Sequence, residues 1–185
     1  MGQNELQTGL AMRGNVTLTA DQDNQYLMID STIVRVHQQA ASGKGAKDQA
    51  LGRSRGGLTT KIHMLADALG RPVRFIITAG QVGDVTAAPA LVEGLAGGAV
   101  LADKAYDSNA FRRRVTDMGA AAVIPSNRTR KILIPHDATA NKRRNRIERC
   151  FNRLKHFRRF ATRYDRRTVH FTGFIHLAAA MIWLR

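Results

Sequence analysis

The chain of 185 residues has the length of one ordinary domain, which can bury about two thirds of its unfolded surface. Its one cysteine, Cys150, excludes an internal disulfide bond, argues against a zinc site and favours a reducing compartment. No apolar run reaches the roughly 18 residues needed to cross a bilayer, and the N-terminal residues lack the layout of a signal peptide. These features predict a cytoplasmic protein with no membrane partner.

The net charge of +15 lies entirely in the second half of the chain. Residues 1–103 contain 9 Lys and Arg and 9 Asp and Glu, whereas residues 104–185 contain 20 and 5. Residues 142–167 alone hold 12 basic side chains, against only Glu148 and Asp165. This density exceeds that of an ordinary solvated helix face and favours contact with a phosphate backbone.

The first half of the chain is rich in strand patterns. Residues 1–25 are polar, show no helical stripe and predict a disordered or atypical leader. A buried strand is expected over residues 26–33, then a glycine-rich and lysine-rich loop over residues 42–57. Residues 58–66 and 72–78 predict a hairpin around a turn. Three strands therefore come first.

The second half alternates helices with short strands. A helix capped by Asp84 is expected to extend to Leu95, and the apolar strand 99–102 ends at Asp103. A helix to residue 118, a strand at 120–124 and a basic loop at 126–139 follow. Apolar residues at helical spacing predict a helix over residues 141–161 and another over 168–184. The pattern predicts one α/β domain over residues 26–185, with a mixed five-stranded sheet flanked by helices.

Two aspartates stand out because they interrupt or end buried strands. Asp30 lies within one apolar strand and Asp103 ends another, so their carboxylates could meet if the strands are neighbours. With Glu148 on the following helix they could hold two Mg²⁺ ions, since carboxylate oxygens are the ligands that Mg²⁺ prefers. The alternatives are ordinary. An aspartate at a strand end is more often a turn former or a helix cap, and Glu148 could simply pair with Arg144.

Three motifs surround the three acidic residues. The first is MIDST at residues 28–32, followed by LGRSRGGLTTKIH at residues 51–63. The second is ADKAYDS at residues 102–108. In the third, Arg144 lies four residues before Glu148 and Lys155 lies seven residues after it. Together these motifs resemble those of the DDE transposases of bacterial insertion sequences, especially the group around insertion sequence five. The resemblance covers residues 26–185, with Asn141 in place of a frequent tyrosine and Ala105 in place of the usual glycine.

The resemblance implies an RNase H-like core in which Asp30, Asp103 and Glu148 are the catalytic residues and metal ligands. Two Mg²⁺ ions, for which Mn²⁺ could substitute, would be the cofactors. Arg144 and Lys155 would face DNA phosphates. We expect further DNA contacts from one more arginine of the same helix and from the basic loop before it, namely Arg149, Arg128, Arg130 and Lys131.

The implied function is metal-dependent cleavage and strand transfer of an insertion sequence. The partners would be double-stranded DNA, as terminal repeats and target, together with further copies of this chain and a separate upstream transposase segment. One alternative is a catalytically inactive DNA-binding remnant or regulator of transposition. Another is a structure-selective nuclease of the same fold, which would cleave branched DNA without joining it.

Overall fold

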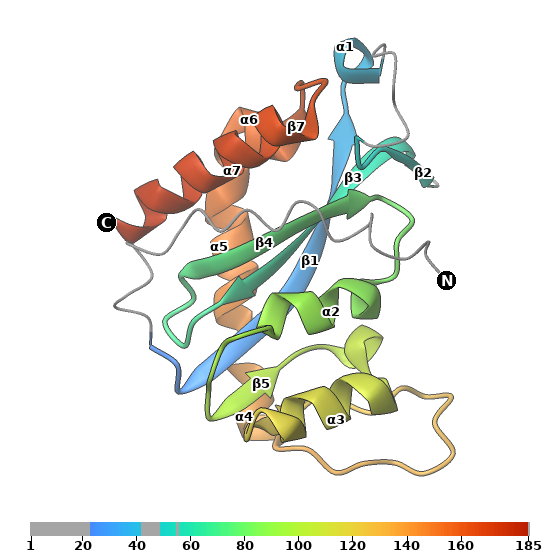
Figure 1. The fold of residues 1–185 in the computed structure, drawn as a ribbon, viewed down its shortest axis with the longest axis vertical. Helices are drawn as coiled ribbons and strands as arrows, with labels where there is room; N and C mark the ends of the chain where they lie inside the picture. Colours follow the sequence, from blue (N-terminus) through green and yellow to red (C-terminus); the bar gives the residue numbers. More distant parts are fainter. Residues whose placement is uncertain (1–22, 42–48, 55, 185) are drawn as a thin grey trace, which may run out of the picture.

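The computed structural model describes residues 23–41, 49–54 and 56–184 (Figure 1). The leader predicted over residues 1–25 lies almost wholly outside these residues, as do residues 42–48 and 55 of the loop predicted over residues 42–57.

A mixed β-sheet with β1 (Tyr26–Val36) at its centre organises the fold (Figure 1). β1 pairs antiparallel with β3 (Gly57–Ala66) on one side and parallel with β5 (Ala99–Leu101) on the other. β4 (Pro72–Ala79) extends the sheet antiparallel beyond β3, and β6 (Ala121–Val123) extends it parallel beyond β5. The predicted α/β class is confirmed, and the three long antiparallel strands β1, β3 and β4 precede β5 and β6 in the chain.

The sheet has seven strands, so the prediction of five was wrong. β2 (Gly52–Ser54) pairs with the start of β3, and β7 (Thr162–Arg163) pairs with the end of β1. Both strands are too short to show the period-two alternation on which a strand prediction depends. β2 also replaces part of the loop expected over residues 42–57.

Helices cover both faces of the sheet (Figure 1). α2 (Asp84–Val92) and α3 (Asn109–Asp117) pack on one face, and α5 (Asn145–Lys155) and α7 (Thr168–Trp183) pack on the other. The remaining helices are short: α1 (Gln38–Ala41), the 3-10 helix η2 (Lys104–Tyr106), α4 (Ala138–Lys142) and α6 (Arg158–Ala161). None of the helices in the described part of the chain combines the length and apolar character that a membrane crossing requires.

The single helix predicted over residues 141–161 is divided into α4, α5 and α6. Asp137 caps α4 by accepting hydrogen bonds from the backbone N–H groups of Thr139 and Ala140. Arg143 and Arg144 keep helical backbone angles between α4 and α5, and extended backbone at Phe157 separates α5 from α6. The helical spacing of apolar residues therefore continues from α4 to α6, and it gives no sign of the two breaks between these helices.

Alternate residues of β1 enter two different hydrophobic cores. Met28 and Val34 pack beneath α5 and α7, whereas Leu27 and Ile29 pack beneath α2 and α3. This alternation follows from the geometry of a strand, in which successive side chains point to opposite faces. The position of a polar residue along β1 therefore decides on which face of the sheet its side chain lies.

Candidate active site

Asp30 and Asp103 lie at corresponding positions on neighbouring parallel strands. Met28 of β1 pairs with Leu101 of β5. Asp30 and Asp103 each lie two residues after these paired residues. Side chains two residues apart on extended backbone share a face. Since Met28 and Leu101 belong to the core beneath α5 and α7, the two carboxylates lie toward α5. The two strands are neighbours, which is the condition under which the sequence allowed these carboxylates to meet.

Glu148 reaches the same place from α5. The helix buries Ile147, Cys150, Phe151 and Leu154 against the sheet, which leaves Glu148 at the border of its buried face. Arg144, one turn earlier, donates from Nη2 to Glu148 Oε1 at 2.6 Å and from Nη1 to Asp30 Oδ2 at 3.1 Å. One guanidinium group thus joins the strand carboxylate to the helix carboxylate. The alternative pairing of Glu148 with Arg144 is therefore present, but it extends to Asp30.

The electrostatics of Asp30 reflect this crowding. Burial raises the pKa of Asp30 to about 6, although the Ser31 N–H group, at 2.8 Å, and the Arg144 charge act in the opposite direction. The negative charges of Asp103 and Glu148 raise the pKa of Asp30 further. The three carboxylates are therefore close enough to repel one another, and one arginine serves at least two of them.

The donor set fits a divalent cation in its chemistry. All three side chains offer carboxylate oxygens, which Mg²⁺ and Mn²⁺ prefer, and a cation would relieve the repulsion that raises the pKa of Asp30. The three side chains do not, however, converge on one point as the ligands of a bound metal ion do. Among the described residues, no group of three or more His, Cys, Asp and Glu side chains is arranged to hold a metal ion. Arg144 lies where Asp30 and Glu148 would have to converge.

A polar network behind Asp30, on the opposite face of the sheet, escaped the sequence analysis. Ser31 Oγ donates to Asp84 Oδ1 at 2.8 Å, and Lys61 Nζ donates to the same oxygen at 2.8 Å. Lys61 also donates to the Val82 carbonyl oxygen at 2.6 Å. Because the Ser31 N–H group binds Asp30, the network fixes the backbone that carries the carboxylate. The sequence feature that could have indicated this network is Lys61, a charged residue within a strand that is buried along most of its length.

The role predicted for Asp84 as a helix cap was wrong. Gly83 occupies the N-cap position without a side-chain bond, and Asp84 stands in the first turn of α2. Its carboxylate is drawn away from the helix by Ser31 and Lys61, which supply stronger donors than the free N–H groups at the helix start.

Tyr106 and His63 are two further buried polar residues near the network. Burial, together with the charges of Asp84, Asp30 and Asp103, raises the pKa of Tyr106. Burial lowers the pKa of His63 to about 4, and its Nε2 lies 2.8 Å from the hydroxyl oxygen of Thr78. Both side chains are therefore neutral at physiological pH and add no charge to the site.

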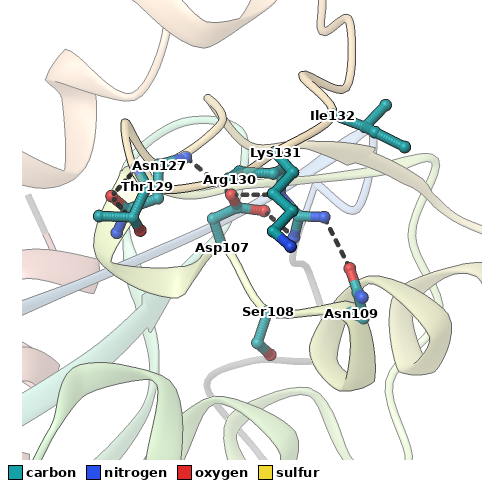
Figure 2. A pocket seen from close by; sticks show the side chains of 8 residues that line it. All are labelled: Asp107, Ser108, Asn109, Asn127, Thr129, Arg130, Lys131 and Ile132. Carbon is teal, nitrogen blue, oxygen red and sulfur yellow. Dashed lines mark hydrogen bonds and ion pairs between the residues drawn. The ribbon is translucent and has the colours of Figure 1, made fainter.

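The basic side chains of the loop before α4 differ in their contacts within the protein. Arg130 donates from Nε to Asp107 Oδ2 and from Nη2 to Asp107 Oδ1, each at 2.8 Å (Figure 2). It also binds the side chain of Asn109 at 2.7 Å. Arg128 and Lys131 are exposed. Arg130 is thus committed within the protein, whereas Arg128 and Lys131 remain available to a partner.

The predicted cations of α5 point in different directions. At about 100° per residue, Arg144 and Lys155 lie near the face of Glu148, whereas Arg149 is turned away by roughly a quarter of a circle. Lys155 is exposed. Arg149 lies with Arg146 and Arg153 along a separate hollow beside Leu69. By its helical position, Lys155, but not Arg149, lies on the face of α5 that carries Glu148.

The chain is similar to known proteins over most of its length. The family described as "Transposase DDE domain" matches residues 21–184. A putative transposase for insertion sequence element IS6501 of Brucella ovis is 44% identical over 130 residues, which cover 69% of this chain and 100% of the relative. A putative transposase for insertion sequence element IS402 of Burkholderia cepacia is 34% identical over 135 residues, which cover 66% of this chain and 62% of the relative.

Among solved structures, a piggyBac transposase synaptic complex with hairpin DNA shows a TM-score of 0.41 and 14% identity, over 62% of this chain and 25% of that one. A place in the group around insertion sequence five stays a prediction. From the family match and the two relatives, the chain belongs to the DDE transposases of bacterial insertion sequences.

Proposed function

We propose that residues 26–185 form a catalytic domain that cleaves and transfers DNA strands in a Mg²⁺-dependent reaction. The observation that carries this proposal is that Asp30, within β1, and Asp103, just after the parallel strand β5, lie near enough to Glu148 of α5 for the charges of Asp103 and Glu148 to raise the pKa of Asp30. These three elements lie far apart in the sequence. A purely structural ion pair would require one acid for Arg144, whereas the site gathers three.

The proposed roles follow from the chemistry of the side chains. Asp30, Asp103 and Glu148 would bind the cations through carboxylate oxygens. Two Mg²⁺ ions, when bound, would activate the attacking oxygen and stabilise the leaving oxygen of the phosphodiester. Arg144 and Lys155 would bind phosphates on either side of Glu148, since residues four before and seven after it share its face. The network of Ser31, Asp84 and Lys61 would hold Asp30 in position.

The proposed substrate is double-stranded DNA, as the terminal repeats of the element and as target. The concentration of positive charge in residues 104–185 supports this choice, because phosphate contacts dominate the affinity of proteins for DNA. Joining two element ends to a target would require several copies of the chain on DNA.

The proposal is tested with duplexes that carry the terminal repeats of the element. We expect cleavage with Mg²⁺ or Mn²⁺ and little with Ca²⁺, because the larger ion fits the octahedral geometry poorly. Glu148→Gln should abolish cleavage while DNA binding persists. Asp117→Asn is the matched control, since it makes the same kind of change at an exposed position of α3.

The products separate the alternatives. Joined strands support a transposase, whereas cleavage restricted to branched DNA would support a structure-selective nuclease. Binding without cleavage under any divalent cation would contradict the proposal and favour an inactive DNA-binding remnant.

A further inference from the structure

Helix α5 carries a second basic face, away from the three carboxylates. Arg146, Arg149 and Arg153 are all exposed and line one hollow of about 480 Å³ together with Leu69. At about 100° per residue, Arg146 and Arg153 point roughly 140–160° away from Glu148 around the helix. A ligand in this hollow therefore cannot be the phosphodiester that Glu148 serves.

The turn between β3 and β4 forms the other wall, and it is held firmly against α5. Gly70 has a φ of +81°, and an added Cβ would stand only 3.0 Å from the Cβ of Arg146. Arg146 Nη1 donates to the Ala68 carbonyl oxygen. Only glycine permits this backbone conformation and this close approach without strain. The hollow is thus a built feature between two fixed elements, with the exposed Leu69 at its rim.

The nearest acid of this turn is already neutralised. The fully buried carboxylate of Asp67 pairs with Arg71 at 2.7 Å and accepts hydrogen bonds from the backbone N–H groups of Leu69 and Arg71. Within the described residues, no Asp or Glu forms an ion pair with any of the three arginines that line the hollow. Three like charges on adjacent turns repel one another, so an anion would stabilise this face.

The spacing fits a row of phosphates. Arg146 and Arg153 are seven residues apart, which corresponds to about 10 Å along a helix. One DNA strand carries a phosphate for about every 3.4 Å of duplex axis, but successive phosphates lie farther apart along the winding strand, so the face can meet about two of them. Guanidinium groups suit phosphate oxygens because they can donate two parallel hydrogen bonds.

We propose that the hollow lined by Arg146, Arg149 and Arg153 binds the phosphate backbone of a second DNA segment. One chain would then hold two segments at once, the first at Glu148 and the second on the opposite side of α5. This inference rests on the proposed DNA substrate and adds to it a second, non-catalytic binding site. A separate acidic protein partner is the competing occupant.

The test is a capture experiment with two duplexes. Protein saturated with one immobilised duplex is offered a second, labelled duplex, and the captured label is measured together with the protein-to-DNA ratio. The triple variant Arg146→Gln, Arg149→Gln, Arg153→Gln should capture at least about tenfold less label and still bind the first duplex. It should also flatten the salt dependence of capture by up to about three charges.

The matched control removes the same charge from exposed sites elsewhere, as Arg53→Gln, Arg113→Gln, Arg114→Gln. This control should capture the second duplex like the unmodified chain. Equal losses in both triple variants, or undiminished capture by the Arg146 triple variant, would overturn the inference. If the unmodified chain binds one duplex and captures no second, the inference alone fails. If it binds no duplex at all, the proposed function fails with it.

Discussion

Two clusters of arginine and aspartate in this protein have opposite balances of charge. At the candidate active site, the single guanidinium group of Arg144 is shared by Asp30 and Glu148, and Asp103 adds a further negative charge. At the loop before α4, the single carboxylate of Asp107 is shared by Arg112 and Arg130. Negative charge exceeds positive charge in the first cluster, whereas positive charge exceeds negative charge in the second.

Solvent exposure and pKa follow the same division. The Asp107 side chain is 0% exposed, whereas those of Asp30 and Glu148 are 20% and 45% exposed. Burial would raise the pKa of Asp107, but hydrogen bonds from Arg130, the Asn127 N–H group and Arg112 outweigh it and hold that pKa well below its usual range. The pKa of Asp30 is raised to about 6. Asp107 is arranged for stability, and Asp30 retains the unbalanced charge that a cation-binding site needs.

The largest expected effect is on activity at the first cluster. Asp30→Asn should lower the rate of DNA cleavage by at least about 100-fold, because a carboxylate ligand becomes an amide. The free energy of unfolding should change by less than about 1 kcal/mol, because relief of repulsion among the carboxylates offsets the lost Arg144 contact. Cleavage assays and urea denaturation measure the two quantities. Severe unfolding of Asp30→Asn would contradict the contrast between the clusters.

The corresponding change at the second cluster should act on stability. Asp107→Asn should lower the free energy of unfolding by about 3 kcal/mol, because it leaves two arginines partly buried without their carboxylate. Urea denaturation of the variant and of Asp117→Asn, at an exposed site on α3, provides the comparison. A loss no greater than that of the control would show that Asp107 does not anchor the loop.

The stabilisation from Asp107 should also depend on pH. The folded pKa of this group is lowered, so its contribution is complete above the unfolded pKa of about 3.9 and is lost as the pH falls below it. The difference in unfolding free energy between the unmodified chain and Asp107→Asn should therefore be constant above about pH 5 and narrow toward pH 3. Denaturation curves at several pH values measure it. A difference that widens in acid would refute the assignment.

The smallest expected effects concern the cations of the loop. Replacing the exposed Arg128 and Lys131 with glutamine should weaken DNA binding several-fold and reduce its salt dependence by up to about two charges, without loss of stability. Arg130→Gln should instead lower the free energy of unfolding, since its guanidinium group is bound to Asp107. Binding titrations over a range of salt, with thermal unfolding, separate the two outcomes.

The sequence was informative where a periodic pattern coincides with a long element. The strands 57–66 and 72–79 and the helix 168–183 were predicted to within one residue of their observed ends, because burial fixes which residues must be apolar. The strand 26–36 was predicted only as far as residue 33. The adjacency of Asp30 and Asp103 also followed once their strands were neighbours. The short strands β2 and β7, with three and two residues, carry no period and were missed.

Side-chain partners were far less predictable than strands. Arg144 was expected to face DNA phosphates, but nothing in its spacing from Glu148 indicates that it also binds Asp30, 114 residues away in the chain. The bonds of Asp84 with Ser31 and Lys61, and of Asp107 with Arg112 and Arg130, likewise depend on tertiary approach. Residue type and spacing indicate which groups can interact, and the fold decides which of them meet.

The double contact of Arg144 would link the two proposed binding events at this site, that of a divalent cation and that of DNA. Its guanidinium group uses Nη1 for Asp30 and Nη2 for Glu148, so a DNA phosphate that draws this group away would compete with both contacts. A phosphate that attracts Arg144 would leave these carboxylates without their counter-ion and so raise their affinity for a divalent cation. By thermodynamic reciprocity, a cation bound there would raise the affinity for DNA by the same factor. The chain without DNA would accordingly bind divalent cations weakly, and the cation site needed for cleavage would form only when DNA is bound.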